Sequence, residues 1–253
     1  MIDTLKAELR KLLTVRSTYI TSGLALAITI FVSFYIEGYR GLSGSPASIG
    51  GAGALEEIIV NVASTVAVFT AIVAVLFMAH EYRHNLIMYT LTASNSRTKV
   101  LLAKIATITV YAVLFTVLST AVAIGSYYIG LALRDVSLPA QAIDFWYISG
   151  RVAFYCIANA LLGLLLASLL RSIVGSIAIL FIASSTIEPL LSLVLKENAI
   201  YLPFSALQQV ITPGLKIAEA GTLSAGRAVL VSLAYLTAGW LITWWLFRRR
   251  DAN

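Results

Sequence analysis

Long runs of apolar residues alternate with short polar, basic or Gly- and Pro-containing stretches along the whole chain. Most of these runs approach or exceed about 20 residues, the length that an α-helix needs to cross a hydrocarbon core about 30 Å thick. Helices are expected because each satisfies its own backbone hydrogen bonds in lipid. The pattern predicts an all-α membrane protein with six transmembrane helices: about Thr18–Ile36, Ile58–Ala79, within Val100–Leu133, Ile148–Leu170, from Ile173, and Ala228–Phe247.

The composition supports this fold class. Hydrophobic residues make up 59% of the 253 residues and charged residues only 12%, and a water-soluble chain of this length could not bury so much apolar surface. The segments between the runs are too short for a separate soluble domain. Cys156 is the only cysteine, which excludes a disulfide framework and predicts a small core residue in the fourth run.

The basic residues are distributed unevenly between the two sides of the predicted membrane. Twelve of the 18 Lys and Arg residues fall on the side that holds both termini. The positive-inside rule therefore predicts that both termini are cytoplasmic. The net charge of +6 is then a topology signal, and no nucleic-acid partner is expected.

The first seventeen residues predict an interfacial helix ahead of the first span. Apolar residues recur on one helical face, and charged residues recur on the other. Such a helix lies in the headgroup layer with its cations toward anionic lipid. A basic flank that only fixes the topology is the alternative. The cations expected to face the lipid headgroups are Lys6, Arg10, Lys11 and Arg16.

Residues 80–84 satisfy the H-E-x-x-H pattern of zinc metalloproteases. On a helix His80 and His84 would share one face and bind the metal, with Glu81 as general base. A third ligand is hard to find, because the chain has only these two His residues and one Cys. An intramembrane zinc metalloprotease is therefore the alternative function.

The same stretch carries a second pattern: Glu81-Tyr82-Arg83, then Thr90-Leu91-Thr92, then Arg97, and finally Leu102-Ala103-Lys104. In order and spacing this resembles the cytoplasmic loop of ABC-2 type transporter permeases, the membrane subunits of ATP-binding-cassette exporters. Arg171 resembles the tight basic turn of that family between spans four and five. The chain departs from the family pattern at residues 84–87. The resemblance implies one ABC-2 type transmembrane domain over residues 1–253, in a prokaryotic cell membrane.

The resemblance implies that residues 80–99 form a cytoplasmic coupling segment that docks into a separate ATPase subunit. The apolar turn at residues 86–89 needs a groove to bury it, although a helix that rests on lipid without a partner is the alternative. Arg97, Lys99 and Lys104 are expected to anchor the third span at the phosphates. The residues expected to couple to the ATPase are Glu81, Tyr82, Arg83, Leu86, Ile87, Tyr89 and Arg97.

The ATPase is expected on another polypeptide. The chain contains no Gly-Lys dipeptide and hence no G-x-x-x-x-G-K-[ST] phosphate loop. No cofactor is expected in this chain, and ATP and Mg would bind to the partner subunit.

The fifth run is interrupted by Glu188-Pro189. Pro189 is expected to kink or end the helix. An ionisable residue at the depth of Glu188 is expected to face a cavity, water or a partner, which makes it a candidate for the translocation path. A snorkelling surface carboxylate is the alternative. Residues 189–226 look like the re-entrant outer helices of ABC-2 permeases.

The sequence thus favours the permease subunit of an exporter that moves an amphiphilic drug, peptide or lipid outward. A homodimer or a dimer with a paralogous permease is expected from the family. Gly163 and Ala167, small residues at a close-packing spacing, favour such pairing. A passive membrane scaffold is a further alternative.

Overall fold

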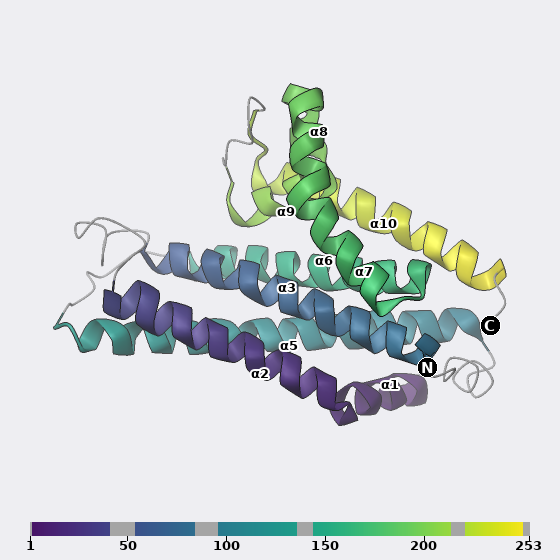
Figure 1. Ribbon diagram of the computed structural model, residues 1–253, viewed down its shortest axis with the longest axis horizontal. Coiled ribbons are helices and arrows are strands. Elements are labelled where there is room, and N and C mark those ends of the chain that lie inside the picture. Colours follow the sequence, from purple (N-terminus) through teal and green to yellow (C-terminus); the bar gives the residue numbers. More distant parts are fainter. Residues whose placement is uncertain (1, 41–53, 84–95, 136–143, 214–220, 250–253) are drawn as a thin grey trace.

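The computed structural model describes residues 2–40, 54–83, 96–135, 144–213 and 221–249. Within these ranges every regular element is a helix, and no strand occurs (Figure 1). The elements are α1 (Ile2–Thr14), α2 (Arg16–Ile30), η1 (Phe31–Arg40), α3 (Ala54–Arg83), α5 (Arg97–Ala132), α6 (Phe145–Leu170), α7 (Ile173–Ile182), η2 (Ala183–Ile187), α8 (Glu188–Leu195), η3 (Lys196–Tyr201), α9 (Pro203–Ile211) and α10 (Ala225–Arg249).

The described residues contain 6 helical stretches that are long and apolar enough to cross a membrane. This confirms the predicted six-span architecture of a multi-pass membrane protein. The third stretch is the longest: α5 is one helix of 36 residues, or about 54 Å at 1.5 Å per residue. It exceeds the hydrocarbon thickness, so its ends extend beyond the hydrocarbon core or the helix tilts, as predicted. The stretches are Arg16–Arg40, Leu55–Arg83, Thr98–Ala132, Phe145–Leu170, Ile173–Tyr201 and Ala225–Leu246.

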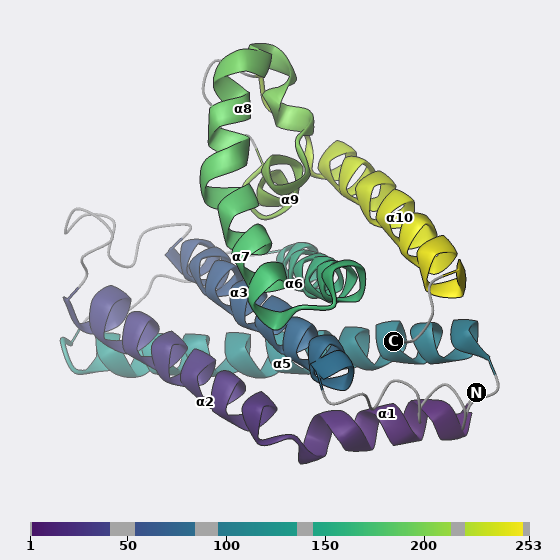
Figure 2. The same cartoon turned by 45° about the vertical axis from the view of Figure 1, so that its right-hand side comes forward.

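Four of these helices form an elongated bundle in which α3 packs against α2, α5 and α6 (Figure 1). The spans alternate in direction, so α3 ends and α5 begins at the same end of the molecule as α1. The continuous helix α7–η2–α8 and the last helix α10 lean away from this bundle, and α9 lies between them beside α6 (Figure 2). The helix α7–η2–α8 and the helix α10 therefore diverge from the bundle on one side of it, with α9 between them.

A close helix crossing in the bundle brings Gly163 of α6 against Ala71 of α3. A Cβ atom added to Gly163 would overlap the carbonyl oxygen of Ala71. Ala167, one turn further along α6, is fully buried. Both small residues therefore serve packing within the chain, and the expectation that they support pairing with another permease is wrong for this pair.

Replacing Gly163 with alanine is expected to destabilise the protein by about 1–3 kcal/mol, because the backbone of α3 must move to admit a methyl group. Gly150 on the same helix provides the matched control, since a Cβ there meets nothing within 4 Å. Gly150→Ala is expected to be neutral or stabilising by up to about 1 kcal/mol, from helix propensity. Thermal unfolding of both variants in detergent measures the difference, and equal melting temperatures would contradict the close crossing.

Pro189 neither ends the fifth span nor stands at a break in it. The helix runs from Ile173 to Leu195 and widens into the π-helical segment η2 directly before Pro189. Proline lacks an N–H group and its ring clashes with the carbonyl four residues earlier, so a wider turn at this point accommodates the ring. The expected helix end is therefore wrong, and a local change of helix type accompanies Pro189.

Candidate functional site

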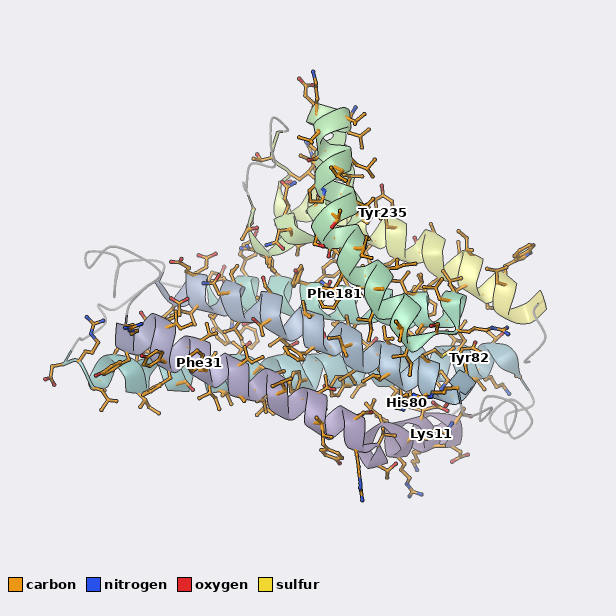
Figure 3. The ribbon with its side chains drawn as sticks, viewed as in Figure 1. Lys11, Phe31, His80, Tyr82, Phe181 and Tyr235 are labelled. Atoms are coloured by element: carbon orange, nitrogen blue, oxygen red, sulfur yellow. The ribbon has the colours of Figure 1, made fainter. Side chains whose placement is uncertain are left out.

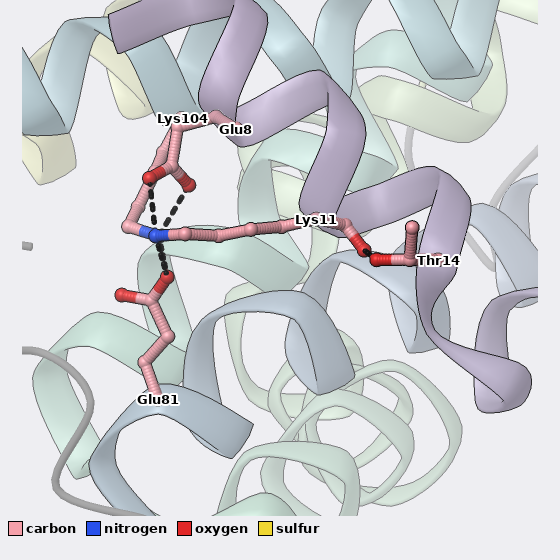
Figure 4. A network of polar contacts seen from close by, with 5 residues as sticks. All are labelled: Glu8, Lys11, Thr14, Glu81 and Lys104. Carbon is pink, nitrogen blue, oxygen red and sulfur yellow. Dashed lines mark hydrogen bonds and ion pairs between the residues drawn. The ribbon is translucent and has the colours of Figure 1, made fainter.

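Four charged side chains meet where α1, the end of α3 and the start of α5 come together (Figure 4). We call this group of Glu8, Lys11, Glu81 and Lys104 the ion cluster. Lys104 Nζ lies 2.8 Å from Glu8 Oε2 and 2.7 Å from Glu81 Oε1. Lys11 Nζ lies 2.7 Å from Glu8 Oε1 and 3.0 Å from Glu81 Oε1. Two carboxylates and two ammonium groups thus form a network without net charge.

Three of the four members of the ion cluster are buried, which makes the cluster energetically demanding, while Lys11 is 39% exposed. The side chains of Lys104 and Glu8 are 0% and 1% exposed, and that of Glu81 is 6% exposed. Lys104 Nζ also lies 4.6 Å from the centre of the Phe77 ring, a cation–π contact. Removing one member of such a network leaves an uncompensated buried charge. The ion cluster therefore fixes α1 to the α3–α5 corner in one arrangement.

Lys104 was expected to anchor the third span at lipid phosphates, and the structure corrects this. Its side chain is fully buried and its ammonium group is taken up by Glu8 and Glu81. Lys104 follows two turns of helix after Arg97 in a strongly apolar stretch. Its side chain therefore points into the packed corner between helices, where only a carboxylate partner can compensate its charge.

Lys11 was expected to face the headgroups on the polar side of α1, and it instead reaches into the ion cluster. Burial by itself lowers the pKa of Lys11, but hydrogen bonds and attraction from Glu8 and Glu81 outweigh it and raise the pKa above 10.5. Because the pKa of Lys11 is raised in the folded protein, its interactions contribute stability that is fully present below pH 10.5. This stability is lost only as the pH rises through the raised pKa. The other cations on this segment, Lys6, Arg10 and Arg16, are exposed.

The three residues at the end of α3 point in different directions. Glu81 enters the ion cluster, whereas the ring of Tyr82 lies 5.1 Å from the guanidinium carbon of Arg171. Arg171 occupies the turn between α6 and α7 with a left-handed backbone, φ 53°, and Ser172 caps α7 by accepting a hydrogen bond from the Gly175 N–H. Arg83 is exposed. Successive residues at about 100° spacing on a helix thus contact α1 and α5, then the α6–α7 turn, then the exterior.

The structure describes only some of the other residues that are expected to couple to the ATPase. Leu86, Ile87 and Tyr89 lie outside the described residues, as do residues 90–95. Arg97 is the first residue of α5. Ser96 caps this helix by accepting a hydrogen bond from the Lys99 N–H, so both ends of segment 84–95 join helices held by the ion cluster.

The geometry does not favour the zinc alternative. Glu81 Oε1 lies against the ammonium groups of Lys11 and Lys104, and Oε2 is buried, so the carboxylate faces the packed corner, whereas a general base must reach a metal-bound water. No group of three His, Cys, Asp or Glu side chains that could hold a metal occurs in the described ranges. His84 lies outside them.

A second polar site holds α9 at both ends, and we call it the α9 clamp. Glu188 Oε1 accepts a hydrogen bond of 2.7 Å from the Phe204 N–H. Its Oε2 atom accepts hydrogen bonds of 2.8 Å from the Ser205 N–H and hydroxyl groups. At the other end the Arg151 guanidinium donates to the carbonyl oxygens of Val210 and Ile211. A carboxylate at the start and a cation at the end of the helix match the helix dipole.

The α9 clamp explains why Glu188 is tolerated inside an apolar span. The residue is 6% exposed, so the surface-carboxylate alternative does not fit. α9 begins at Leu202-Pro203 without a side-chain cap of its own, and its unpaired N–H groups need an acceptor. Glu188, on the helix before it, supplies that acceptor and also lines a cavity.

One comparison places the chain among known families. The model of the family described as "Protein of unknown function (DUF2705)" matches residues 14–252. The chain belongs to the DUF2705 family. A comparison with curated proteins gives no match.

In this DUF2705 protein the matched range includes the α9 clamp and the α3 and α5 members of the ion cluster. Glu8 and Lys11 lie before residue 14, the first matched residue. The contacts that join α1 to the bundle therefore link a segment ahead of the match to the part that defines the family.

Three residues with polar structural roles were not predicted from the sequence: Glu8 in the ion cluster, Arg151 in the α9 clamp, and Gln209 on α9. Arg151 lies within the fourth span, at 8% exposure, where an ionisable residue signals a partner. The same signal was present for Lys104 in the third span. Glu8 and the buried Gln209, whose Oε1 accepts a hydrogen bond from the Leu223 N–H, carry no such signal in the sequence.

Proposed function

We propose that this DUF2705 protein is the permease subunit of an ATP-binding-cassette exporter in a prokaryotic cell membrane, with both termini in the cytoplasm. It pairs with itself or with a paralogous permease and moves an amphiphilic substrate outward. A separate ATPase subunit binds ATP and Mg and docks on residues 80–99. Residues 189–226 act as re-entrant outer helices, and α1 lies at the lipid surface with Lys6, Arg10 and Arg16 toward the headgroups.

The observation that carries this proposal is the ion cluster with its neighbouring Tyr82–Arg171 contact. Together they tie α1, the end of α3, the start of α5 and the α6–α7 turn into one unit (Figure 3). Segment 84–95 leaves and re-enters this unit. A displacement of that segment by the ATPase would therefore move several spans together, as coupling of ATP hydrolysis to transport requires.

The buried charges also suit this role better than the role of a passive scaffold. A buried ionic network contributes less stability than apolar packing of the same volume, and its value lies in fixing one arrangement. Here the network fixes α1 against the end of α3 and the start of α5, where the proposed coupling segment attaches.

Replacing Ile87 with aspartate is expected to abolish assembly with the ATPase. Burying an unpaired charge in a docking groove costs several kcal/mol, or at least about 100-fold in affinity. The chain is co-expressed with candidate ATP-binding-cassette ATPases from the same genome, and the retained ATPase and its hydrolysis rate are measured after purification. Ile87→Leu is the matched control and is expected to retain both.

The melting temperature of Ile87→Asp separates docking from folding, because residue 87 lies outside the packed corner under this proposal. An unchanged melting temperature with lost ATPase supports the coupling role. A full complement of ATPase with normal hydrolysis in Ile87→Asp would show that residues 80–99 are not the coupling segment.

A further inference from the structure

A cavity of about 360 Å³ lies beside the α9 clamp, between α6, the helix α7–η2–α8 and α9. One part of its wall is apolar and includes Val68, Leu180, Phe181 and Leu207. Phe181, labelled in Figure 3, lies on α7 where this helix leaves the bundle. The rest of the wall is polar and consists of Tyr155, Asn159, Ser184, Glu188, Ser192, Ser205 and Gln208.

The serine hydroxyl groups in the polar wall already donate their hydrogens in hydrogen bonds within the protein. Ser184 Oγ donates to the Leu180 or Phe181 carbonyl at 3.0 or 3.1 Å. Ser192 Oγ donates to the Pro189 carbonyl at 2.7 Å, and Ser205 Oγ donates to Glu188 at 2.8 Å. A hydroxyl has one hydrogen and two lone pairs. Each of these oxygens therefore remains an acceptor only.

The amide and carboxylate groups add further acceptors, so the cavity wall offers more hydrogen-bond acceptors than donors. Asn159, 8% exposed, donates from Nδ2 to the Tyr155 carbonyl at 2.9 Å, and no donor from the described ranges reaches its Oδ1 atom. Glu188 Oε1 accepts one hydrogen bond, from Phe204, although a carboxylate oxygen can accept two. The Tyr155 hydroxyl donates to Gln208 Oε1 at 3.3 Å, which leaves the Gln208 Nε2 group as a donor against many acceptors.

We propose that this cavity binds a protonated amine with N–H groups on an apolar body. This inference rests on the proposed function in taking the amine as the exported substrate. The ammonium group donates to Asn159 Oδ1 and Ser184 Oγ near the Glu188 carboxylate. The apolar body lies along Val68, Leu180, Phe181 and Leu207.

Charge and donor count together select this ligand class. Among the described residues that line the cavity, Glu188 is the one acidic residue and none is Lys or Arg, so an anion would meet repulsion without a cation from them to offset it. An alcohol brings a single donor and no charge. Hydrogen bonds to charged groups are about twice as strong as neutral ones, so an ammonium group satisfies the acceptors best.

Direct binding to the purified full chain in lipid nanodiscs tests the inference without the ATPase. Isothermal titration with octylamine, octyltrimethylammonium and octanoate is compared with empty nanodiscs. The first two ions carry the same charge, but octyltrimethylammonium has no N–H group. Octylamine is expected to bind at least about tenfold more tightly than octyltrimethylammonium, and octanoate is expected to show no saturable binding.

Two serines in neighbouring positions give a matched pair of variants. Ser184 lines the cavity, whereas Ser185 is exposed and donates to the Phe181 carbonyl at 2.7 Å. Ser184→Ala is expected to weaken octylamine binding by about tenfold, because one acceptor of the charged ammonium group is lost. Ser185→Ala is expected to leave the affinity unchanged.

Equal affinities for octylamine and octyltrimethylammonium, absence of saturable binding, or an equal loss in Ser185→Ala would each overturn the inference. Its failure is distinguishable from failure of the proposed function. A chain that assembles with the ATPase but does not bind octylamine keeps the exporter and loses the amine site. A chain that binds octylamine with this selectivity but assembles with no ATPase keeps the site and loses the exporter.

Discussion

Replacing Lys104 with methionine is expected to lower the free energy of unfolding by about 3–5 kcal/mol, the largest effect of any single substitution proposed for this protein. Methionine matches the length of the side chain but leaves Glu8 and Glu81 facing each other in a buried corner with only Lys11 between them. Lys99 on the same helix is exposed, and Lys99→Met is the matched control. It is expected to change stability by less than about 0.5 kcal/mol.

Cys156 provides the measurement. It is the only cysteine in the chain and is fully buried, so a thiol-reactive fluorophore reports its exposure during a thermal ramp in detergent. For Lys104→Met a fall in melting temperature of about 10 °C is expected. A melting temperature within the error of the Lys99→Met control would show that the ion cluster is not formed.

A double-mutant cycle separates the charge effect from the loss of packing. In Glu8→Gln/Lys104→Met the remaining Glu81 and Lys11 again balance each other. The double variant is therefore expected to be more stable than the sum of its single variants predicts, by about 1–3 kcal/mol. Strict additivity would mean that Glu8 and Lys104 do not interact.

Replacing Glu188 with alanine is expected to release α9 while the bundle stays folded. Three hydrogen bonds to a carboxylate are lost, and two backbone N–H groups at the start of α9 lose their acceptor. The free energy of local opening is expected to fall by about 3 kcal/mol, so hydrogen exchange of α9 amides accelerates by about 100-fold.

The control for this effect is Glu197→Ala, because Glu197 is an exposed carboxylate in the neighbouring segment η3. That variant is expected to leave exchange in α9 unchanged. Exchange in α3 serves as the internal reference for both. If α9 exchanges at the wild-type rate in Glu188→Ala, the carboxylate does not hold α9 and the α9 clamp is reduced to Arg151.

The spans were predictable because their signal is local. A run of apolar residues specifies a lipid-crossing helix whatever its neighbours are. The predicted start at Ile148 and end at Leu170 of the fourth span match α6 within three residues at one end and at the same residue at the other. The tight turn at Arg171, expected from the family resemblance, is also present: Arg171 has a left-handed backbone, and Ser172 caps α7.

Pro189 shows where a local rule was insufficient. The proline rule gives the lost hydrogen bond and the steric clash, but it does not say how the helix responds. The π-helical segment η2 ends one residue before Glu188-Pro189, and Glu188 accepts a hydrogen bond from the Phe204 N–H in the first turn of α9. Neither the wider turn nor this distant partner follows from the proline rule.

The sequence by itself determined the fold class, the six spans, the buried Cys156 and the presence of intramembrane charges that required partners. Only the tertiary structure decided which partners those charges have. Glu8 and Lys104 are separated by 96 positions and Arg151 and Val210 by 59, so no helical period or turn signal relates them. Hydrophobic length is a property of one segment in lipid. The pairing of buried charges is a property of how several segments pack, because each charge is tolerated only where another helix brings its counterpart within hydrogen-bonding distance.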